Sequence, residues 1–174
     1  MHPLQHAQVI VEPMNNTIRL LLACVIALSL DALTKAWAEQ TLTLYQPMPV
    51  LSDLLRFTLG YNTGITFGLF SNSGSAPLIV TGIIILGMFI WSLLAVRRGE
   101  FSGTAVWLLG FILGGAVGNF VDRLPDLRVT DFLDMGIGTL RWYTFNVADV
   151  FIMFGALILF LLLFFQKELL ASEK

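Results

Sequence analysis

Apolar residues are gathered into four long blocks instead of being spread along the chain. The blocks cover residues 18–37, 77–96, 104–121 and 147–165. About 20 residues of helix cross a hydrocarbon core of about 30 Å, because each residue adds about 1.5 Å. We therefore predict four transmembrane helices that belong to one integral membrane domain over residues 1–174.

The segments between the blocks, 38–76 and 122–146, have a different pattern. Short runs in them alternate apolar and other residues with a period of two, as half-buried strands do. Gly136 and Gly138 provide a turn between the last two runs. The predicted class is an all-α membrane protein with a small extracytoplasmic β-sheet that can cradle an extended peptide. The runs are 41–45, 55–61, 129–133 and 139–143.

The distribution of charge sets the orientation only in part. An even number of spans places both termini on one side, and five Lys or Arg residues lie on each side of the predicted bilayer. The rule that cytoplasmic segments are richer in Lys and Arg therefore does not decide the orientation. Eight of the twelve acids lie on the long-loop side, which tips the balance towards cytoplasmic termini.

Composition excludes several classes of protein. The chain is 56% hydrophobic and 13% charged, whereas soluble domains carry about 25% charged residues. A formal net charge of -2 leaves no basic excess for nucleic acid. Cys24 is the single cysteine, so no intramolecular disulfide forms, and no Cys/His cluster predicts a metal or cofactor. Residues 21–24 resemble a lipobox, but the apolar run continues past Cys24, so a buried, apolar role for this cysteine is expected.

Polar residues inside or beside the spans are the candidates for function, because ionisable groups in hydrocarbon cost at least about 2.5 kcal/mol each. Asp31 and Lys35 stand at i and i+4, the favourable order for an ion pair on one helix face. The pair has two interpretations, a neutralised structural pair or part of a site.

The third block ends in a second polar group. Glycine recurs every fourth residue from Gly110 to Gly118, a ridge that lets another helix approach closely. Asn119, Asp122 and Arg123 follow at i, i+3 and i+4. This spacing gathers an amide, a carboxylate and a guanidinium at one corner of the helix, where they can hold a polar group of a ligand.

Two further carboxylates are the candidates for chemistry. Asp131 lies in a predicted strand, and Asp149 follows Asn146 by three residues at the start of the fourth block. Asn146 fits a helix N-cap and Asp149 fits the positive end of the helix dipole, which is a purely structural interpretation. The catalytic interpretation is a carboxylate pair that shares one proton, so that one member acts as base and the other as acid.

Two other classes of function compete with an enzyme. Intramembrane Asp31, Asp122 and Asp149 suit a small ion channel or transporter, although the acids cluster at the long-loop ends of the spans and no internal repeat is visible. A non-catalytic assembly subunit that docks through the glycine ridge would leave Asp131 and Asp149 replaceable.

Five segments of the chain resemble the type II (lipoprotein) signal peptidases, a family of intramembrane aspartic proteases of the bacterial inner membrane. They occur in the family's order from the first span to the fourth. Ile65 and Thr66 stand where the family more often has smaller residues. The segments are DALTK (31–35), NTGITFG (62–68), GGAVGNFVDR (114–123), VTDF (129–132) and FNVAD (145–149).

The resemblance implies a fold of four helices with cytoplasmic termini and a site on the periplasmic side, and a monomer among membrane lipids. Its implied substrate is a diacylglyceryl-modified prolipoprotein, cut on the amino side of the lipidated cysteine without a metal or cofactor. It implies that Asp131 and Asp149 are catalytic. It further implies that Asn62, Gly64, Asn119, Arg123 and Asn146 bind substrate, and that Asp31, Lys35 and Asp122 support the site.

The two carboxylates are expected to hold their shared proton unequally. Asp149 lies in the first turn of a helix, where the dipole favours its anion, whereas Asp131 lies in an apolar strand that favours the neutral acid. We therefore expect Asp149 to be the base that activates water and Asp131 to be the proton donor.

Overall fold

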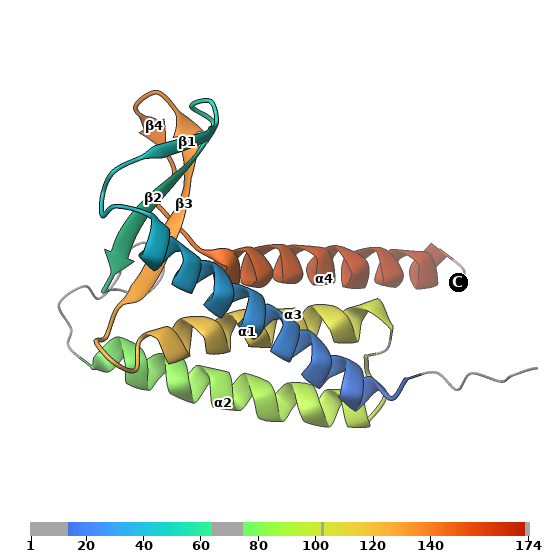
Figure 1. Cartoon of the computed structure of the whole chain (residues 1–174). Coiled ribbons are helices and arrows are strands. Elements are labelled where there is room, and N and C mark those ends of the chain that lie inside the picture. The colour runs from blue at the N-terminus through green and yellow to red at the C-terminus, as the bar shows by residue number, and fades with distance from the viewer. Residues whose placement is uncertain (1–13, 64–74, 102, 173–174) are drawn as a thin grey trace, which may run out of the picture.

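The described residues of the computed structural model are 14–63, 75–101 and 103–172. They form four long helices, each long and apolar enough to cross a membrane, so the four predicted spans are confirmed (Figure 1). The helices extend the predicted blocks by at most four residues, except at the end of α4, which continues to Ser172. They are α1 (Asn16–Thr41), α2 (Ala76–Arg97), α3 (Thr104–Asp122) and α4 (Val147–Ser172).

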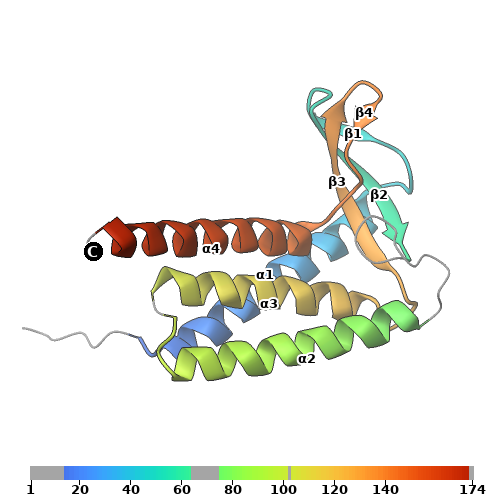
Figure 2. The ribbon, with the colours of Figure 1, turned by 180° about the vertical axis from the view of Figure 1, so that it is seen from behind.

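Helix α3 is the centre of the bundle, with α1 and α4 packed along it and α2 beside it (Figures 1 and 2). The predicted glycine ridge makes this packing possible. A Cβ atom on Gly110 would lie 2.5 Å from the carbonyl oxygen of Leu20 in α1. Gly115, which is not part of the predicted ridge, allows the close approach of α4, because a Cβ atom there would lie 2.5 Å from the carbonyl oxygen of Ala148. Gly118 lies directly against the Asp31 carboxylate. Glycine at these positions brings the polar ends of three helices together.

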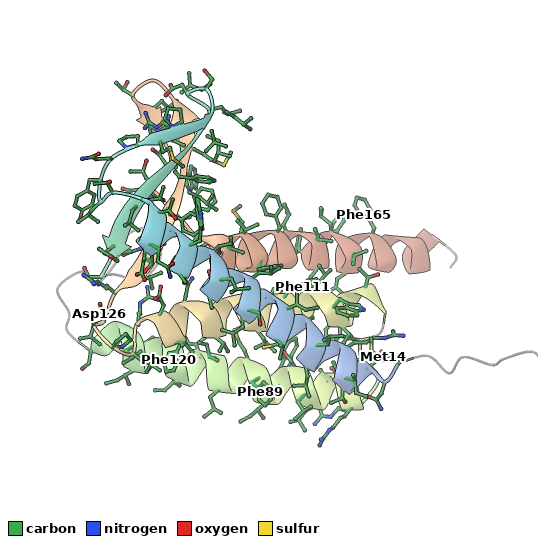
Figure 3. The ribbon with its side chains drawn as sticks, viewed as in Figure 1. Met14, Phe89, Phe111, Phe120, Asp126 and Phe165 are labelled. Atoms are coloured by element: carbon green, nitrogen blue, oxygen red, sulfur yellow. The ribbon has the colours of Figure 1, made fainter. Side chains whose placement is uncertain are left out.

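The outward faces of the helices are apolar. Phe89 on α2 and Phe165 on α4 are partly or largely exposed and point away from the bundle (Figure 3). Phe111 of α3 instead stacks on Phe151 of α4, with ring centroids 5.3 Å apart. This arrangement suits helices that are surrounded by hydrocarbon and not by water.

A four-stranded antiparallel sheet lies at one end of the bundle, in the order β1-β2-β3-β4 (Figure 1). Gly60 of β2 faces Asp131 of β3, and the ladder is irregular between Phe57 and Gly60. Gly138 has a φ of 56° in the turn between β3 and β4, where glycine is favoured. The strands are β1 (Met48–Leu51), β2 (Leu55–Asn62), β3 (Val129–Ile137) and β4 (Leu140–Arg141).

One expectation about the strands is corrected, and one strand was not expected. Residues 41–45 do not form a strand: α1 continues to Thr41, and Leu44 makes only an isolated bridge with Leu59. The strand before β2 is β1, which begins one residue after Pro47 and contains Pro49. Proline in a run of residues argues against a strand in the middle of a sheet, but it is tolerated at the edge, where β1 lies. Analysis of the sequence pattern therefore did not predict β1.

An aromatic cluster fixes the sheet onto the end of α1. Trp37 makes edge contacts with Phe57 of β2 at 5.1 Å and Phe132 of β3 at 6.1 Å between ring centroids. Ala38 and Leu59 are buried in the same cluster. Because Phe132 directly follows Asp131 in β3, the contact between Trp37 and Phe132 places Asp131 close to the end of α1.

Candidate active site

Asn146 joins the two candidate catalytic carboxylates, which come from different elements. Its side-chain Nδ2 donates to Oδ1 of Asp131 in β3 at 2.7 Å, and its backbone N–H donates to Oδ2 of Asp149 in α4 at 3.1 Å. Its Oδ1 accepts from the backbone N–H of Asp149 at 3.0 Å, which confirms the predicted N-cap. The residue that caps α4 therefore also contacts both candidate catalytic carboxylates.

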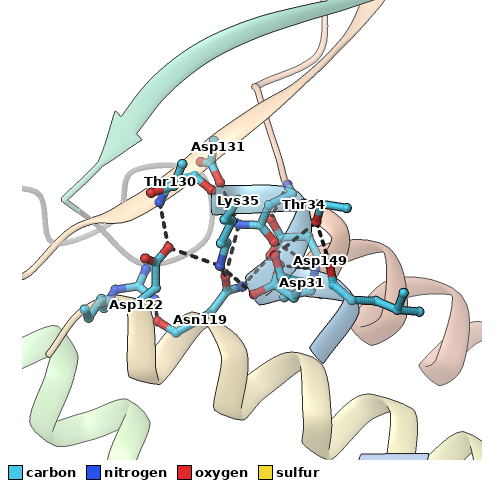
Figure 4. A network of polar contacts seen from close by, with 12 residues as sticks. Asp31, Thr34, Lys35, Asn119, Asp122, Thr130, Asp131 and Asp149 are labelled. Carbon is cyan, nitrogen blue, oxygen red and sulfur yellow. Dashed lines mark hydrogen bonds and ion pairs between the residues drawn. The ribbon is translucent and has the colours of Figure 1, made fainter. Parts of the chain in front are cut away.

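Asn119 makes a second link to Asp149. Its Nδ2 donates to Asp149 Oδ1 at 2.8 Å, and its Oδ1 accepts from Asn146 Nδ2 at 3.0 Å. The same Oδ1 accepts from Lys35 Nζ at 2.9 Å, which joins α1 to the network (Figure 4). Both oxygens of Asp149 thus have donors, an arrangement that favours a carboxylate anion.

Lys35 is a buried cation at the centre of the site. Its Nζ lies 2.8 Å from Asp31 and 3.1 Å from Asp122, so the predicted pair of Asp31 and Lys35 forms and gains a second acid. Asp31 is 1% exposed and also accepts the backbone N–H of Ala148 at 2.9 Å. Burial of these charges is tolerable because each has an opposite charge or a hydrogen-bond donor.

Thr130 contacts three different elements just before Asp131. Its N–H donates to Asp122 at 2.8 Å, and its hydroxyl donates to Glu39 at the end of α1 at 2.8 Å. Its carbonyl accepts from Asn146 Nδ2 at 3.3 Å. Pattern analysis missed Glu39 and Thr130, and the only available signal was their position at the end of a span and beside Asp131.

Arg123 caps the end of α3 and lies close to the carboxylates. Its Nη1 donates to the carbonyl of Asn119 at 2.9 Å, and the residue is buried. Burial lowers the pKa of its guanidinium, and the negative charges of Asp131, Asp149 and Asp122 oppose that change. These charges place Arg123 within electrostatic reach of both candidate catalytic residues.

Asp131 is in an unusual environment for a carboxyl group. Burial, and then the negative charge of Asp149, raise its pKa from 3.8 to about 7. Hydrogen bonds from Asn146 and Asn62 and the charge of Lys35 act in the opposite direction. Asp131 is therefore able to keep its proton close to neutral pH.

The structure brings together all but one of the residues singled out from the sequence. Asn62 ends β2 and reaches Asp131 through its side chain. Gly64, with Ile65 and Thr66, lies outside the described residues. The residues that share this network or contact it are Asp31, Lys35, Asn62, Asn119, Asp122, Arg123, Asp131, Asn146 and Asp149.

Within the described ranges, no group of three or more His, Cys, Asp or Glu side chains is arranged to hold a metal ion. Cys24 packs, partly buried, against the apolar core between α1 and α3. The two carboxyl groups of the site are surrounded by the amides of Asn119 and Asn146 and the cations of Lys35 and Arg123.

Comparison with sequence families finds one that matches most of the chain. The family described as signal peptidase (SPase) II matches residues 23–165. The chain is 37% identical over 149 residues to a protein from Hydrogenovibrio crunogenus, covering 82% of this chain and 83% of that protein. It is also 37% identical over 148 residues to one from Brevibacillus brevis, covering 85% and 95% respectively. Both relatives are named lipoprotein signal peptidase.

Solved structures share the fold. One, described as a bacterial membrane enzyme determined by the in meso method at 2.3 Å, has a TM-score of 0.73 at 22% identity. That alignment covers 86% of this chain and 88% of the other. A second, described in the same way at 1.9 Å, has a TM-score of 0.70 at 23% identity, with 83% and 91% covered.

Proposed function

The chain belongs to the signal peptidase II family, and on that premise we propose that Asp131 and Asp149 are the catalytic pair of an aspartic endopeptidase. The family membership identifies a protease that removes signal peptides from prolipoproteins and crosses the bacterial inner membrane several times. It also sets aside the alternative of a small ion channel or transporter. The proposal adds the class of protease and the residues that perform the reaction.

The observation that carries the proposal is the double hydrogen bond from Asn146. One residue holds an oxygen of Asp131 at 2.7 Å and an oxygen of Asp149 at 3.1 Å. Burial, and then the charge of Asp149, raise the pKa of Asp131 to about 7. Such a pair holds one proton between two groups, which is what acid–base cleavage of an amide requires.

The mechanism follows from the different environments of the two groups. Asp149 accepts hydrogen bonds at both oxygens at the N-terminus of α4, so it is the ionised base that takes a proton from the attacking water. Asp131 in its protonated form donates a hydrogen bond to the oxyanion that develops on the scissile carbonyl. The pair then gives a proton to the leaving amine, and no covalent intermediate forms.

The surrounding residues have separate roles in this proposal. Asn119 and Asn146 hold the carboxyl groups, and they bind substrate together with Asn62, Gly64 and Arg123. Lys35, Asp31 and Asp122 hold the ends of α1, α3 and β3 in register. The substrate is a precursor that already carries diacylglycerol on its cysteine, and the cut falls on the amino side of that cysteine.

We propose that the termini face the cytoplasm. The start of α1 and the end of α4 lie at the end of the bundle opposite the sheet (Figure 1). With the termini in the cytoplasm, the sheet and the carboxyl pair lie on the periplasmic side. We propose that residues 1–174 act there as a single membrane domain, as a monomer among lipids.

The test uses the purified full chain in detergent with two forms of one precursor, diacylglyceryl-modified and unmodified. We expect release of the signal peptide from the lipidated form only. Cleavage of both forms at equal rates would contradict the proposed substrate. Normal cleavage by Asp131→Asn or Asp149→Asn, in protein that elutes as folded enzyme, would contradict the proposed pair.

A further inference from the structure

Three hydrogen bonds from outside the sheet hold Thr130, the residue before Asp131 in β3. Thr130 is 2% exposed, and each of its polar groups has a partner from a different part of the chain. The partners are Asp122 at the end of α3, Glu39 in the last turn of α1, and Asn146 before α4.

The ladder between β2 and β3 becomes irregular directly after this stretch. Asp131 faces Gly60, and the register between β2 and β3 shifts between Phe57 and Gly60. Ladder pairing is disrupted at such an irregularity. The contacts of Thr130 with the helix ends therefore add to its ladder pair with Tyr61, on the side of Asp131 where the ladder is still regular.

The bond between Thr130 and Glu39 differs from the other two. It joins two side chains at 2.8 Å, so substitution can remove it without changing the backbone contacts to Asp122 or Asn146. A hydroxyl that donates to a carboxylate makes a charge-assisted bond, and the buried hydroxyl would otherwise lose its partner. Glu39 itself is exposed, so its removal leaves no buried cavity.

We infer that Glu39 and Thr130 are positioning residues, whose side-chain bond holds Asp131 at its place beside Asp149 and Asn146. This inference rests on the proposed function of Asp131. Neither residue touches the reacting atoms in this account. They act through the backbone of β3, and they tie the end of the first span to the catalytic strand.

The inference predicts a loss of rate without a loss of binding. Displacement of a reacting group by about 1 Å can cost up to about 100-fold in rate. For Thr130→Val, which keeps the shape and removes the hydroxyl, we expect kcat to fall about tenfold. KM should stay within about twofold, because the proposed substrate contacts are unchanged.

The pH profile separates positioning from a general loss of structure. The charged groups around Asp131 are Asp149, Lys35 and Arg123, and the substitution changes none of them. An Asp131 that moves away from Asp149 and towards water loses its proton more easily. The alkaline limb of the kcat profile should therefore move to lower pH in Thr130→Val.

The experiment compares matched variants of the full chain in detergent with the lipidated precursor. Thr130→Ser and Glu39→Gln keep a donor and an acceptor and should stay close to the parent enzyme, whereas Glu39→Ala should resemble Thr130→Val. The double variant Thr130→Val/Glu39→Ala should be no slower than Thr130→Val alone, because both changes remove the same bond. Thermal unfolding of each variant identifies protein that has simply lost its fold.

Two outcomes distinguish failure of this inference from failure of the proposed function. If Asp131→Asn is inactive while Thr130→Val has the parental kcat and pH profile, the positioning role is wrong and the catalytic pair stands. If Asp131→Asn retains full activity, the catalytic pair is wrong and the positioning role falls with it. Additive losses in the double variant would also overturn the inference.

Discussion

Asp131 and Asp134 are three residues apart on the same strand, and both are almost fully buried, yet their surroundings are opposite. Asp134 lies 2.9 Å from Arg56 Nη2 and 2.6 Å from Arg141 Nε, and it accepts the Thr58 hydroxyl at 2.9 Å. Asp131 accepts from neutral amides and faces another carboxylate.

The difference appears in how each carboxyl group holds its proton. Burial would raise the pKa of Asp134, but hydrogen bonds from Arg141, Thr58 and Arg56 outweigh it and hold that pKa below the ordinary value. At Asp131 burial and Asp149 together raise the pKa to about 7. Burial alone therefore does not make a proton donor, and the charge of the neighbouring groups decides the outcome.

The two regions also differ in what they connect. Arg141 donates to the backbone carbonyl of Asp53 at 2.7 Å as well as to Asp134, so the arginine network ties the turn after β1 to β4 at the far end of the sheet. The amide network of Asn119 and Asn146 ties β3 to the helix ends. We expect the first network to stabilise the sheet and, under the proposed function, the second to hold the reacting groups.

The largest expected effect is on catalysis. Asp131→Asn and Asp149→Asn should each lower kcat about 1000-fold or more, because each removes half of the acid–base pair. Asp134→Asn should leave kcat of the folded protein within about threefold, since Asp134 is expected to contribute stability only. Turnover of the lipidated precursor by the three purified variants measures this. Equal losses of kcat in all three variants would contradict the proposed difference between Asp131 and Asp134.

The second effect is on the pH dependence of cleavage. Below its pKa of about 7 Asp131 carries the proton that the mechanism needs, and above it the pair is doubly ionised. The rate should therefore fall as the pH rises through about 7, and a second limb at lower pH should give a bell-shaped profile. Asp134→Asn should leave both limbs where they are. A rate that rises through this range would contradict the assignment.

The third effect is on stability, and it has opposite signs at the two sites. The folded state binds the Asp131 proton more tightly than the unfolded chain, so this group stabilises the fold at low pH and the contribution is lost as the pH rises from 3.8 through about 7. At about pH 8.5, Asp131→Asn should therefore raise the unfolding midpoint by a few degrees.

Asp134 behaves in the reverse way. Its folded-state pKa is lowered, so its contribution is present above 3.8 and is lost as the pH falls. Asp134→Asn should lower the unfolding midpoint by a few degrees at neutral pH, with less effect in acid. Thermal unfolding in detergent across the pH range measures both variants. Shifts of the same sign at both sites would refute the comparison.

The smallest expected effect is that of metal removal. Chelation by EDTA should leave cleavage unchanged within error, because the proposed chemistry uses only the carboxyl pair and water. Activity before and after dialysis against EDTA measures this. A loss of activity that added metal restores would contradict a metal-free mechanism.

The helices and most of the site could be predicted because their signals are local. Apolar length predicts the spans, and the i, i+4 spacing predicts that Asp31 and Lys35 pair. The N-cap role of Asn146 could also be predicted, because it depends on Asp149 three residues away.

The contacts that cross between distant segments could not be predicted in the same way. The bond from Asn146 to Asp131 joins the helix cap to a strand, and the bond from Thr130 to Glu39 joins residues 91 positions apart. Such pairs depend on how the sheet packs against the helices, and the pattern of neighbouring residues in the sequence does not predict that packing. The resemblance to a family supplied the pairing of Asp131 with Asp149 before the structure gave its geometry.

The central claim, that the two carboxyl groups share one proton and that Asp131 holds it, is tested most directly by infrared titration of the resting enzyme with ¹³C-labelled aspartate. The account predicts a protonated carboxyl band that persists until about pH 7, is present in Asp134→Asn and is absent in Asp131→Asn. A band that persists in Asp131→Asn and is lost in Asp149→Asn would place the proton on the wrong residue and contradict the account.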